Sequence, residues 1–355
     1  MGKPLGSSYH FINRMPSNSA RCTWPVFVVG CHRSGTNLLY DTLLSAGGFA
    51  IYRGYLPVHK MLIPRFGSLR DIRNRKNLIQ AWIHSKGFRR SGLDADKLTK
   101  ELISGANTGG DFIRIVMDEV ARKQNTPRWA VYDPDNVLYM RRIKNEIPNA
   151  LFVHIVRDGR DIALSLKKMG EFRPFPWNRK SASLEATALY WKWMVENGRR
   201  NGKSIPQDYL EVRFEELVND PSNTLKMLSA FVDQELDCER IRSESLGSLQ
   251  ESNSSFRLER RQNPVNRWRE KLSAAQIADI ETLVGDCLEK SGYKLTTTAN
   301  QRAPGLRHGA SKFFYPTFFN LKRWMKTQTP AGRMTNLSAL ELAASGEAEG
   351  IETEL

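Results

Sequence analysis

The sequence predicts an α/β protein with a doubly wound parallel sheet that is flanked by helices. Two observations support this fold class. Short runs of apolar residues, Val26–Val29 and Leu151–Val156 among them, are typical of strands that are buried on both faces. Such runs are followed by a turn and then by a segment whose apolar residues have helical spacing, so strands and helices alternate along the chain.

The first half of the chain combines three expected strands with a helical region. The strands are expected at Val26–Val29, Phe49–Tyr52 and Trp129–Tyr132. Leu38–Ala46 repeats leucines at core spacing and predicts a helix after the first strand. Residues 60–127 are basic and are predicted to be mostly helical, with their last helix at Phe112–Lys123. Pro134 ends the third strand because proline has no N–H to donate to a sheet.

The second half continues the alternation. Strands are expected at Leu151–Val156 and Tyr209–Arg213. Helices are expected at Val137–Ile147, Arg160–Met169, Leu184–Arg200, Phe214–Val218, a segment that starts at Pro221, and Ser273–Ser291. Pro148 stops the first of these helices, Pro221 suits a first helical turn, and Ser273 is a suitable N-cap.

One domain accounts for most of the chain. We expect it to span residues 25–328, with residues 60–127 as a helical insertion. Prolines and glycines interrupt residues 1–24, which predicts an irregular leader. Residues 329–355 are rich in Ala, Ser, Gly and Glu, which predicts a disordered acidic tail.

The chain of 355 residues is strongly basic, with a net charge of +15. The excess is concentrated in the first hundred residues, where sixteen Lys and Arg face four aspartates and no glutamate. The first glutamate of the chain is Glu101. A basic excess is typical of proteins that bind nucleic acid, an anionic membrane surface or an anionic ligand, and composition does not choose among these classes.

The sequence shows no pattern of a transmembrane helix or a signal peptide. No run of about 18 apolar residues predicts a transmembrane helix, and the start of the chain lacks the apolar stretch of a signal peptide. The four cysteines, Cys22, Cys31, Cys238 and Cys287, form neither a metal-ligand pair nor a disulfide framework. We therefore expect a cytoplasmic protein whose contact with membranes, if it has any, is peripheral.

The loop after the first strand has the pattern of a phosphate cradle. It reads Gly30-Cys31-His32-Arg33-Ser34-Gly35-Thr36-Asn37, with the glycine spacing of a Walker A loop. A nucleoside triphosphatase would carry Lys and then Ser or Thr after the second glycine, whereas this chain has Thr36 and Asn37 there and a cation at Arg33. The loop is thus suited to phosphate but lacks residues for triphosphate and Mg²⁺ chemistry. The simpler interpretation is an ordinary glycine turn.

A second loop follows the strand Leu151–Val156 and reads Arg157-Asp158-Gly159-Arg160-Asp161. Arg157 at the end of a strand and Ser165 on the next helix can both face the crevice where open α/β sheets bind ligands. A guanidinium group and a hydroxyl there would hydrogen-bond a phosphate. The alternative is a solvated charge cluster in which the aspartates cap the helix.

The two loops together resemble those of the sulfotransferases that use 3′-phosphoadenylyl sulfate (PAPS). The resemblance rests on RSGT after the first strand and RDGRDxxxS about 120 residues later, followed by YLEVRFEELVNDP, NRWREKLS and a last helix that ends in SGY. It covers the chain from Trp24 to Tyr293 and is strongest to the tyrosylprotein and carbohydrate-type branch and its bacterial relatives. It implies a P-loop NTPase-like sheet and sulfuryl transfer to a hydroxyl.

The resemblance also implies roles for particular residues. The 5′-phosphosulfate of PAPS would be held by Arg33, Ser34, Gly35, Thr36 and Asn37. The 3′-phosphate would be held by Arg157 and Ser165, and a later loop over the nucleotide would include Arg267 and Trp268. No metal ion is expected, because a cation and backbone amides can stabilise a phosphate leaving group.

The catalytic base is the main departure from the family pattern. Relatives with the RSGT loop tend to carry a glutamate just after the second strand, where this chain has Tyr55, a poor base. His59 is the natural substitute because its pKa is near neutrality, and the alternative is a surface histidine. Asp133 at the third strand end is a second candidate, with a turn-forming Asp-Pro pair as its alternative. Phe214 replaces a tyrosine that is common in relatives. We therefore expect catalysis by Arg33 together with His59 or Asp133.

Residues 311–326 carry six aromatics, four basic residues and no acid. They predict either an amphipathic helix on an anionic membrane or a C-terminal helix whose aromatics pack on the domain. Two other functions remain open from the sequence, an atypical P-loop kinase and a basic nucleic-acid-binding protein. The Walker lysine that a kinase needs and the motifs of nucleic-acid binders do not occur, so we expect no nucleic-acid partner. The expected partner is a hydroxyl-bearing, anionic acceptor of unspecified class.

Overall fold

A five-stranded parallel sheet lies at the centre of the computed structural model, which describes residues 21–169, 182–236, 264–302, 305–338 and 340. The strand order is β2-β3-β1-β4-β5, and every neighbouring pair is parallel. The strands are β1 (Val26–Gly30), β2 (Phe49–Ala50), β3 (Arg128–Tyr132), β4 (Leu151–Val156) and β5 (Tyr209–Arg213). This topology confirms the predicted fold class, and the order reverses at β1, which places a crevice beyond the carboxyl ends of β1 and β4.

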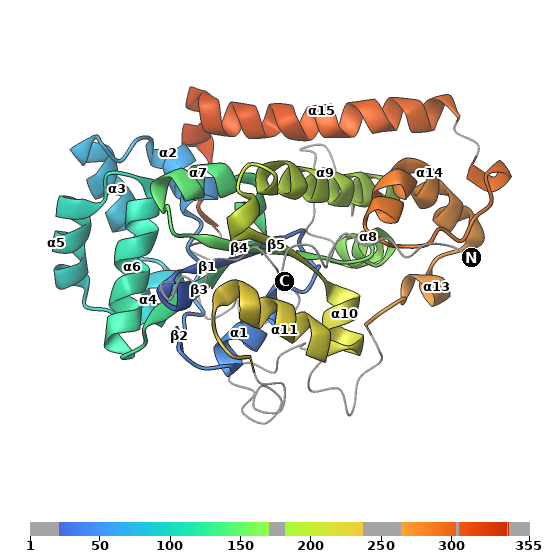
Figure 1. Cartoon of the computed structure of the whole chain (residues 1–355). Helices are drawn as coiled ribbons and strands as arrows, with labels where there is room; N and C mark the ends of the chain where they lie inside the picture. The colour runs from blue at the N-terminus through green and yellow to red at the C-terminus, as the bar shows by residue number, and fades with distance from the viewer. Residues whose placement is uncertain (1–20, 170–181, 237–263, 303–304, 339, 341–355) are drawn as a thin grey trace.

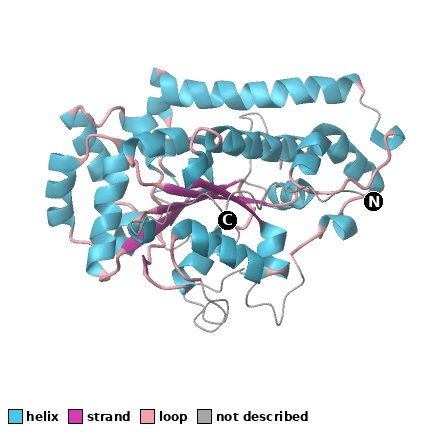
Figure 2. Cartoon of the chain, in the orientation of Figure 1, coloured by secondary structure: helices cyan, strands magenta, loops and turns pink. Residues whose placement is uncertain are grey.

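Helices cover both faces of the sheet (Figure 1; Figure 2). On one face lie α1 (Thr36–Ser45), α10 (Phe214–Asn219) and α11 (Pro221–Val232). On the other lie α7 (Met140–Glu146), α8 (Gly159–Lys168), α9 (Leu184–Gly202) and α14 (Ala274–Lys290). The strands alternate their side chains between two buried clusters, so that Val26 and Val28 join one cluster while Phe27 and Val29 join the other. Both faces of the sheet are therefore covered by buried apolar clusters, as the apolar strand sequences predict.

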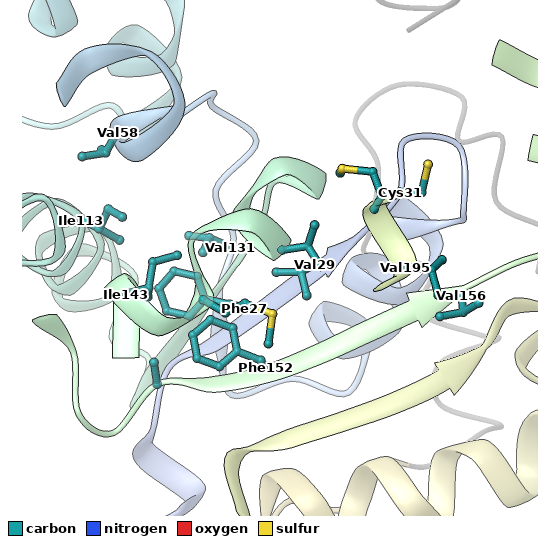
Figure 3. Close-up of a cluster of buried hydrophobic side chains, with 14 of the residues drawn as sticks. Phe27, Val29, Cys31, Val58, Ile113, Val131, Ile143, Phe152, Val156 and Val195 are labelled. Atoms are coloured by element: carbon teal, nitrogen blue, oxygen red, sulfur yellow. The ribbon is translucent and has the colours of Figure 1, made fainter. Parts of the chain in front are cut away.

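The larger cluster packs around aromatic rings on three adjacent strands. The ring of Phe27 stacks on Phe152 with centroids 5.4 Å apart and meets Trp129 edge-on at 5.7 Å. Figure 3 shows Phe27 and Phe152 at its centre, with Val58 and Ile113 reaching it from the helical insertion. The insertion therefore shares the core of the sheet.

The basic region 60–127 is mostly helical, as predicted. Its elements are the π-helix η3 (Val58–Leu62) and the α-helices α2 (Ile63–Phe66), α3 (Ile72–Ile83), α4 (Lys86–Ser91), α5 (Ala95–Gly105) and α6 (Gly109–Lys123). They gather at one end of the sheet (Figure 1). Short elements elsewhere are η2 (Arg21–Thr23), η5 (Pro206–Asp208), α13 (Trp268–Lys271) and η7 (Asn300–Arg302). The long helix α15 (Leu306–Gln328) lies outside α9 as a further layer.

Two predicted segments differ from the structure. The helix expected at Val137–Ile147 is divided into the 3-10 helix η4 (Pro134–Leu138) and α7, because the Asp133 side chain caps a turn that begins at Pro134. The tail expected to be disordered from residue 329 contains the 3-10 helix η8 (Pro330–Met334), and Leu340 is buried. Residues 1–20 and 341–355, which hold most of the predicted leader and tail, lie outside the described residues. None of the described helices is both long enough and apolar enough to cross a membrane.

A buried ion-pair network ties α8 to α14. The Arg160 guanidinium group pairs with Asp158 at 2.7 Å and with Glu281 at 2.5 Å, and all three side chains are almost fully buried. Removal of the arginine would leave two buried carboxylates without their cation. We expect Arg160→Ala to lower the free energy of unfolding by about 3–5 kcal/mol in urea titrations.

Arg114 offers the matched comparison, because its pair with Asp111 is largely exposed. Arg114→Ala is expected to cost less than about 1 kcal/mol. Equal losses for the two variants would show that the Arg160 network does not support the fold.

Candidate anion-binding and catalytic site

The loop between β1 and α1 depends on two glycines. Gly35 has a left-handed backbone with φ of 98°, and a Cβ atom there would collide with the ring of Phe214. A Cβ atom on Gly30 would lie 2.6 Å from the carbonyl oxygen of Ile155 on β4. The loop therefore sits tightly against β4 and α10, and it turns into α1 at Thr36. The N–H groups of the first turn of α1 have no acceptor within the helix and are available to an anion.

The two predicted phosphate loops meet in space. The Nε atom of Arg33 donates to the Oγ atom of Ser165 at 3.1 Å, although the residues are 132 positions apart. The Nη1 atom of Arg157 donates to the carbonyl oxygen of Arg33 at 3.1 Å. These contacts bring together three residues that the sequence predicted for one site.

Positive charge accumulates where the loops meet. Burial and then the neighbouring Arg157 and Arg267 lower the pKa of Arg33, so the three guanidinium groups lie within electrostatic reach of one another. Among the described residues, no carboxylate lies within ion-pair distance of Arg33, and Asp161 approaches Arg157 only at 3.7 Å. The buried Nε atom of Arg157 has no hydrogen-bond partner. Three like charges that outnumber their ion-pair partners among the described residues, together with an unused buried donor, are typical of an anion-binding site.

The ring of Phe214 packs against this site. The Arg157 guanidinium carbon lies 4.5 Å from the centroid of the Phe214 ring, a cation–π contact. The same ring occupies the space that a side chain at Gly35 would need. The Phe214 ring therefore contacts both loops.

A third loop is fastened to the site by Asp161. Its carboxylate accepts hydrogen bonds from the backbone N–H groups of Asn266 at 3.0 Å and Trp268 at 2.9 Å. This places Arg267 within electrostatic reach of Arg33, and its role over a nucleotide stays a prediction. The expectation for Trp268 requires correction, because its buried ring lies between the guanidinium groups of Arg160 at 3.8 Å and Arg269 at 4.5 Å. Trp268 positions the loop and has no free face for a nucleotide.

The remaining loop residues differ in exposure. Ser34 is buried, and its hydroxyl donates to the carbonyl oxygen of Cys31 at 2.5 Å, so its side chain shapes the turn. Thr36 is buried at the start of α1, and Asn37 is exposed in the first turn. No group of three or more potential metal ligands occurs among the residues that the structure describes.

The structure contradicts the expectation that His59 is an accessible base. Its side chain is fully buried, and its Nε2 atom lies 2.8 Å from the Oε2 atom of Glu146 on α7. The ring also stacks on Tyr139, and burial lowers the pKa of the imidazole. Because this face of η3 packs into the core, His59 has no path to an acceptor, and it is also not the surface histidine of the alternative interpretation.

The next residue, Lys60, supplies the polar group that the sequence did not reveal. Its ammonium group forms an ion pair with Asp135 of η4, and Asp135 in turn lies 3.0 Å from the Nε2 atom of His32 in the β1–α1 loop. Burial alone would lower the pKa of Lys60, but Asp135 raises it well above its usual value. In the sequence, the indication of this cluster is the pair of acids in Asp133-Pro134-Asp135 at the end of a strand.

Asp133 retains the properties of a base. One carboxylate oxygen accepts from the backbone N–H of Asp135 at 3.1 Å, whereas the buried Oδ2 atom has no hydrogen-bond partner. Burial and then the charge of Asp135 raise the pKa of Asp133. The carboxylate borders a small pocket lined by Tyr52, Gly54, Leu56, Ile113, Val131, Tyr132 and Asn136. A carboxylate oxygen without a hydrogen-bond partner can accept a proton from a hydroxyl that reaches it through the pocket.

One family profile and several solved structures are similar to this chain. The profile of the sulfotransferase family matches residues 25–237 of the chain. No curated protein shows significant sequence similarity to it. Among solved structures, a sulfotransferase domain from the curacin biosynthetic pathway is 16% identical, with a TM-score of 0.46 over 76% of this chain and 98% of that one. The sulfotransferase domain of the Synechococcus PCC 7002 olefin synthase is 18% identical, with a TM-score of 0.46 over 76% and 95% of the two chains. Sulfotransferase STF9 from Mycobacterium avium is 14% identical, with a TM-score of 0.43 over 82% and 81%.

The anion site predicts a response to simple oxyanions. Sulfate is expected to raise the melting temperature of the protein, because binding to the folded state alone stabilises it. Gly35→Ala is expected to abolish the sulfate-dependent rise, because the new methyl group displaces either the loop or the Phe214 ring. Scanning fluorimetry across a sulfate series at constant ionic strength would measure both effects.

Gly309→Ala is the matched control, because a Cβ atom at this helical position meets no atom within 4 Å. This variant should respond to sulfate like the unmodified protein. A full sulfate response in Gly35→Ala would refute the role of the loop.

Proposed function

The chain belongs to the sulfotransferase family, and from this premise we propose that it transfers a sulfuryl group from PAPS to a hydroxyl group of an acceptor. The observation that carries the proposal is the crevice where Arg33, Arg157 and Arg267 gather with Asp161, 3.7 Å from Arg157, as their ion-pair partner among the described residues, and where the buried Nε atom of Arg157 has no hydrogen-bond partner in the described part of the chain. A donor with several anionic groups would supply the missing partners.

The geometry favours a donor with two separate anionic ends. The first turn of α1 and Arg33 would hold the 5′-phosphosulfate, with Gly35, Thr36 and Asn37 contributing backbone N–H groups. Arg157 and Ser165 would hold the 3′-phosphate, and their contacts with Arg33 keep the two ends at a fixed spacing. ATP has no 3′-phosphate, and the loop lacks the Walker lysine, which favours PAPS over a kinase substrate.

The acid–base chemistry is assigned to the cluster beside the loop. In the proposed step the acceptor oxygen forms a bond to sulfur while the bond from sulfur to the bridging phosphate oxygen breaks. Asp133 takes the acceptor proton, and adenosine 3′,5′-bisphosphate leaves with the electron pair of the broken bond. Lys60, which remains protonated beside Asp135, and Arg33 stabilise the charge that develops on the transferred group and on the leaving phosphate. This in-line transfer requires no metal ion.

The acceptor is proposed to enter through the pocket beside Asp133. Aromatic and aliphatic side chains line it, including Tyr52, Leu56 and Tyr132, and this lining suits the apolar part of a hydroxyl-bearing molecule. A carbohydrate, a glycolipid, a peptide tyrosine and a small alcohol or phenol are all compatible with it. We place the reaction in the cytoplasm, which the buried thiols of Cys31 and Cys287 support.

Recognition of the 3′-phosphate can be tested by ligand-dependent stability. Adenosine 3′,5′-bisphosphate is expected to bind more tightly than 5′-AMP, because Arg157 and Ser165 contact only the former through the extra phosphate. Arg157→Met keeps the stem over Phe214 but removes the guanidinium donors, and it should reduce this preference by about 10- to 100-fold. Titration by calorimetry or thermal shift would measure the two affinities.

Ser165→Ala should weaken the same preference less, and Lys167→Ala, an exposed neighbour on α8, should leave it unchanged. Stabilisation by ATP with Mg²⁺ in place of the bisphosphate would contradict the proposed donor and favour a kinase.

The base can be tested through activity and its pH dependence. Asp133→Asn is expected to lower kcat by about 10²- to 10⁴-fold while affinity for the bisphosphate stays unchanged. A base acts only when ionised, and burial raises the pKa of Asp133. As the pH is lowered, activity should therefore begin to fall at a pH above the ordinary pKa range of an aspartate. Transfer of radiolabelled sulfate to a screened acceptor pool, followed across pH, would supply both readouts.

His59→Gln is the buried control. It should lower thermal stability through the lost pairing with Glu146 and leave kcat per folded molecule unaltered. If His59→Gln abolishes turnover in folded protein and Asp133→Asn does not, the assignment of the base is wrong.

A further inference from the structure

Helix α15 exposes a stripe of apolar side chains to solvent. Of the nine strongly exposed large hydrophobic side chains among the described residues, six lie on this helix: Leu306, Phe313, Phe314, Leu321, Trp324 and Met325. We call these six residues the α15 stripe. At 100° per residue they fall within about 120° of the helix circumference, so they form one continuous face. Trp324 is 55% exposed and Phe313 is 76% exposed, values that are unusual for aromatic side chains of this size.

The opposite face of α15 is fixed to the domain. Phe319 is buried, and its ring lies 5.5 Å from Tyr190 and 5.4 Å from Trp193 on α9. The Nε1 atom of Trp193 donates to the Oδ1 atom of Asn320 at 3.0 Å. The domain therefore accounts for the burial of Phe319, while the side chains of the α15 stripe stay at least 44% exposed on the outermost helix in Figure 1.

The charge of α15 complements an anionic surface. The helix contains no acid and carries Arg307, Lys312, Lys322, Arg323 and Lys326. Glu185 of α9 pairs with Arg307 at the N-terminal end. At the C-terminal end, Arg333 of η8 lies close by in the chain and is exposed, as is Met334. The apolar side chains Leu321, Trp324 and Met325 thus lie in the more basic half of the helix.

We propose that the α15 stripe docks the protein on the surface of a membrane that contains anionic lipids. The apolar side chains would enter the boundary between headgroups and acyl chains, and the exposed cations Lys312, Lys322 and Arg333 would contact lipid phosphates. Arg323 instead faces Asn197 and Trp193 of α9. Tryptophan is favoured at that depth because its ring is apolar and its N–H remains polar. A second copy of this chain is the less favourable occupant, since it would bring two acid-free basic helices together.

Vesicle flotation of the full chain tests the docking surface. The protein is expected to float with vesicles of phosphatidylcholine and phosphatidylglycerol in equal parts, and to float far less with phosphatidylcholine alone. Leu321→Ser combined with Trp324→Ser should lower the affinity at least about thirtyfold, because two large apolar groups no longer leave water. Lys322→Glu should lower it about tenfold on the mixed vesicles.

Ile72→Ser on α3 is the matched control, because Ile72 is 49% exposed on another element. It should float like the unmodified protein, and all variants should keep the sulfate-dependent rise in melting temperature that reports a folded donor site. Absence of flotation with the anionic vesicles, or flotation of the Leu321→Ser and Trp324→Ser variant at the unmodified level, would overturn the proposal. So would sedimentation of a dimer that the same substitutions dissociate while no vesicle binds. None of these outcomes depends on the proposed sulfuryl transfer.

Discussion

The contact between Arg157 and the backbone of Arg33 is the constraint on which the site depends. It joins the loops that follow β1 and β4, and it holds guanidinium groups of like charge in one crevice. The hydrogen bonds that Arg157 donates go to the neutral carbonyl oxygens of Arg33 and Pro264, and Asp161 lies 3.7 Å away as a partial counterion. The glycines of the first loop and the ring of Phe214 leave the chain little room to move the guanidinium groups apart. In the proposed function a bound anion would relieve the repulsion among them, and its binding would use a geometry that the fold already imposes.

Neighbouring residues in the same loop serve two different networks. Arg33 faces Ser165 and the arginines, whereas His32 faces Asp135 and, through it, Lys60. Asp135 is thereby paired with His32 and Lys60 and not with Arg33 or Arg157. An ionised Asp135 beside Asp133 also keeps the second carboxyl group from ionising easily, because two anions in a buried space repel each other. One loop thus separates a region that attracts an anionic donor from a region that can receive a proton.

Much of this arrangement could be predicted from local sequence. The apolar runs predicted the central strands because a strand that is buried on both faces has no need of polar residues. Leu151–Val156 and the half-buried Tyr209–Arg213 match the structure at both ends. The loop motifs predicted that Arg33, Arg157 and Ser165 lie together, because glycine spacing and strand ends fix where their side chains go. Side-chain direction within η3 could not be predicted. His59 and Lys60 are adjacent, and only the packing of η3 against α6 and α7 turns the histidine into the core and the lysine toward Asp135.

The basic excess of the chain is partly structural. Arg75 is buried and donates to the carbonyl oxygens of Leu69 and Ile103, and Arg128 is buried and donates to those of Trp24 and Val232. Such arginines bind carbonyl oxygens in loops and at helix ends, and because a carbonyl is neutral these guanidinium groups need no acid beside them. Burial lowers the pKa of Arg128 to about 10, so the guanidinium group still carries its charge at neutral pH. Arg157 also donates to carbonyl oxygens, but its buried Nε atom has no hydrogen-bond partner among the described residues, and in the proposed function a bound anion would supply that partner.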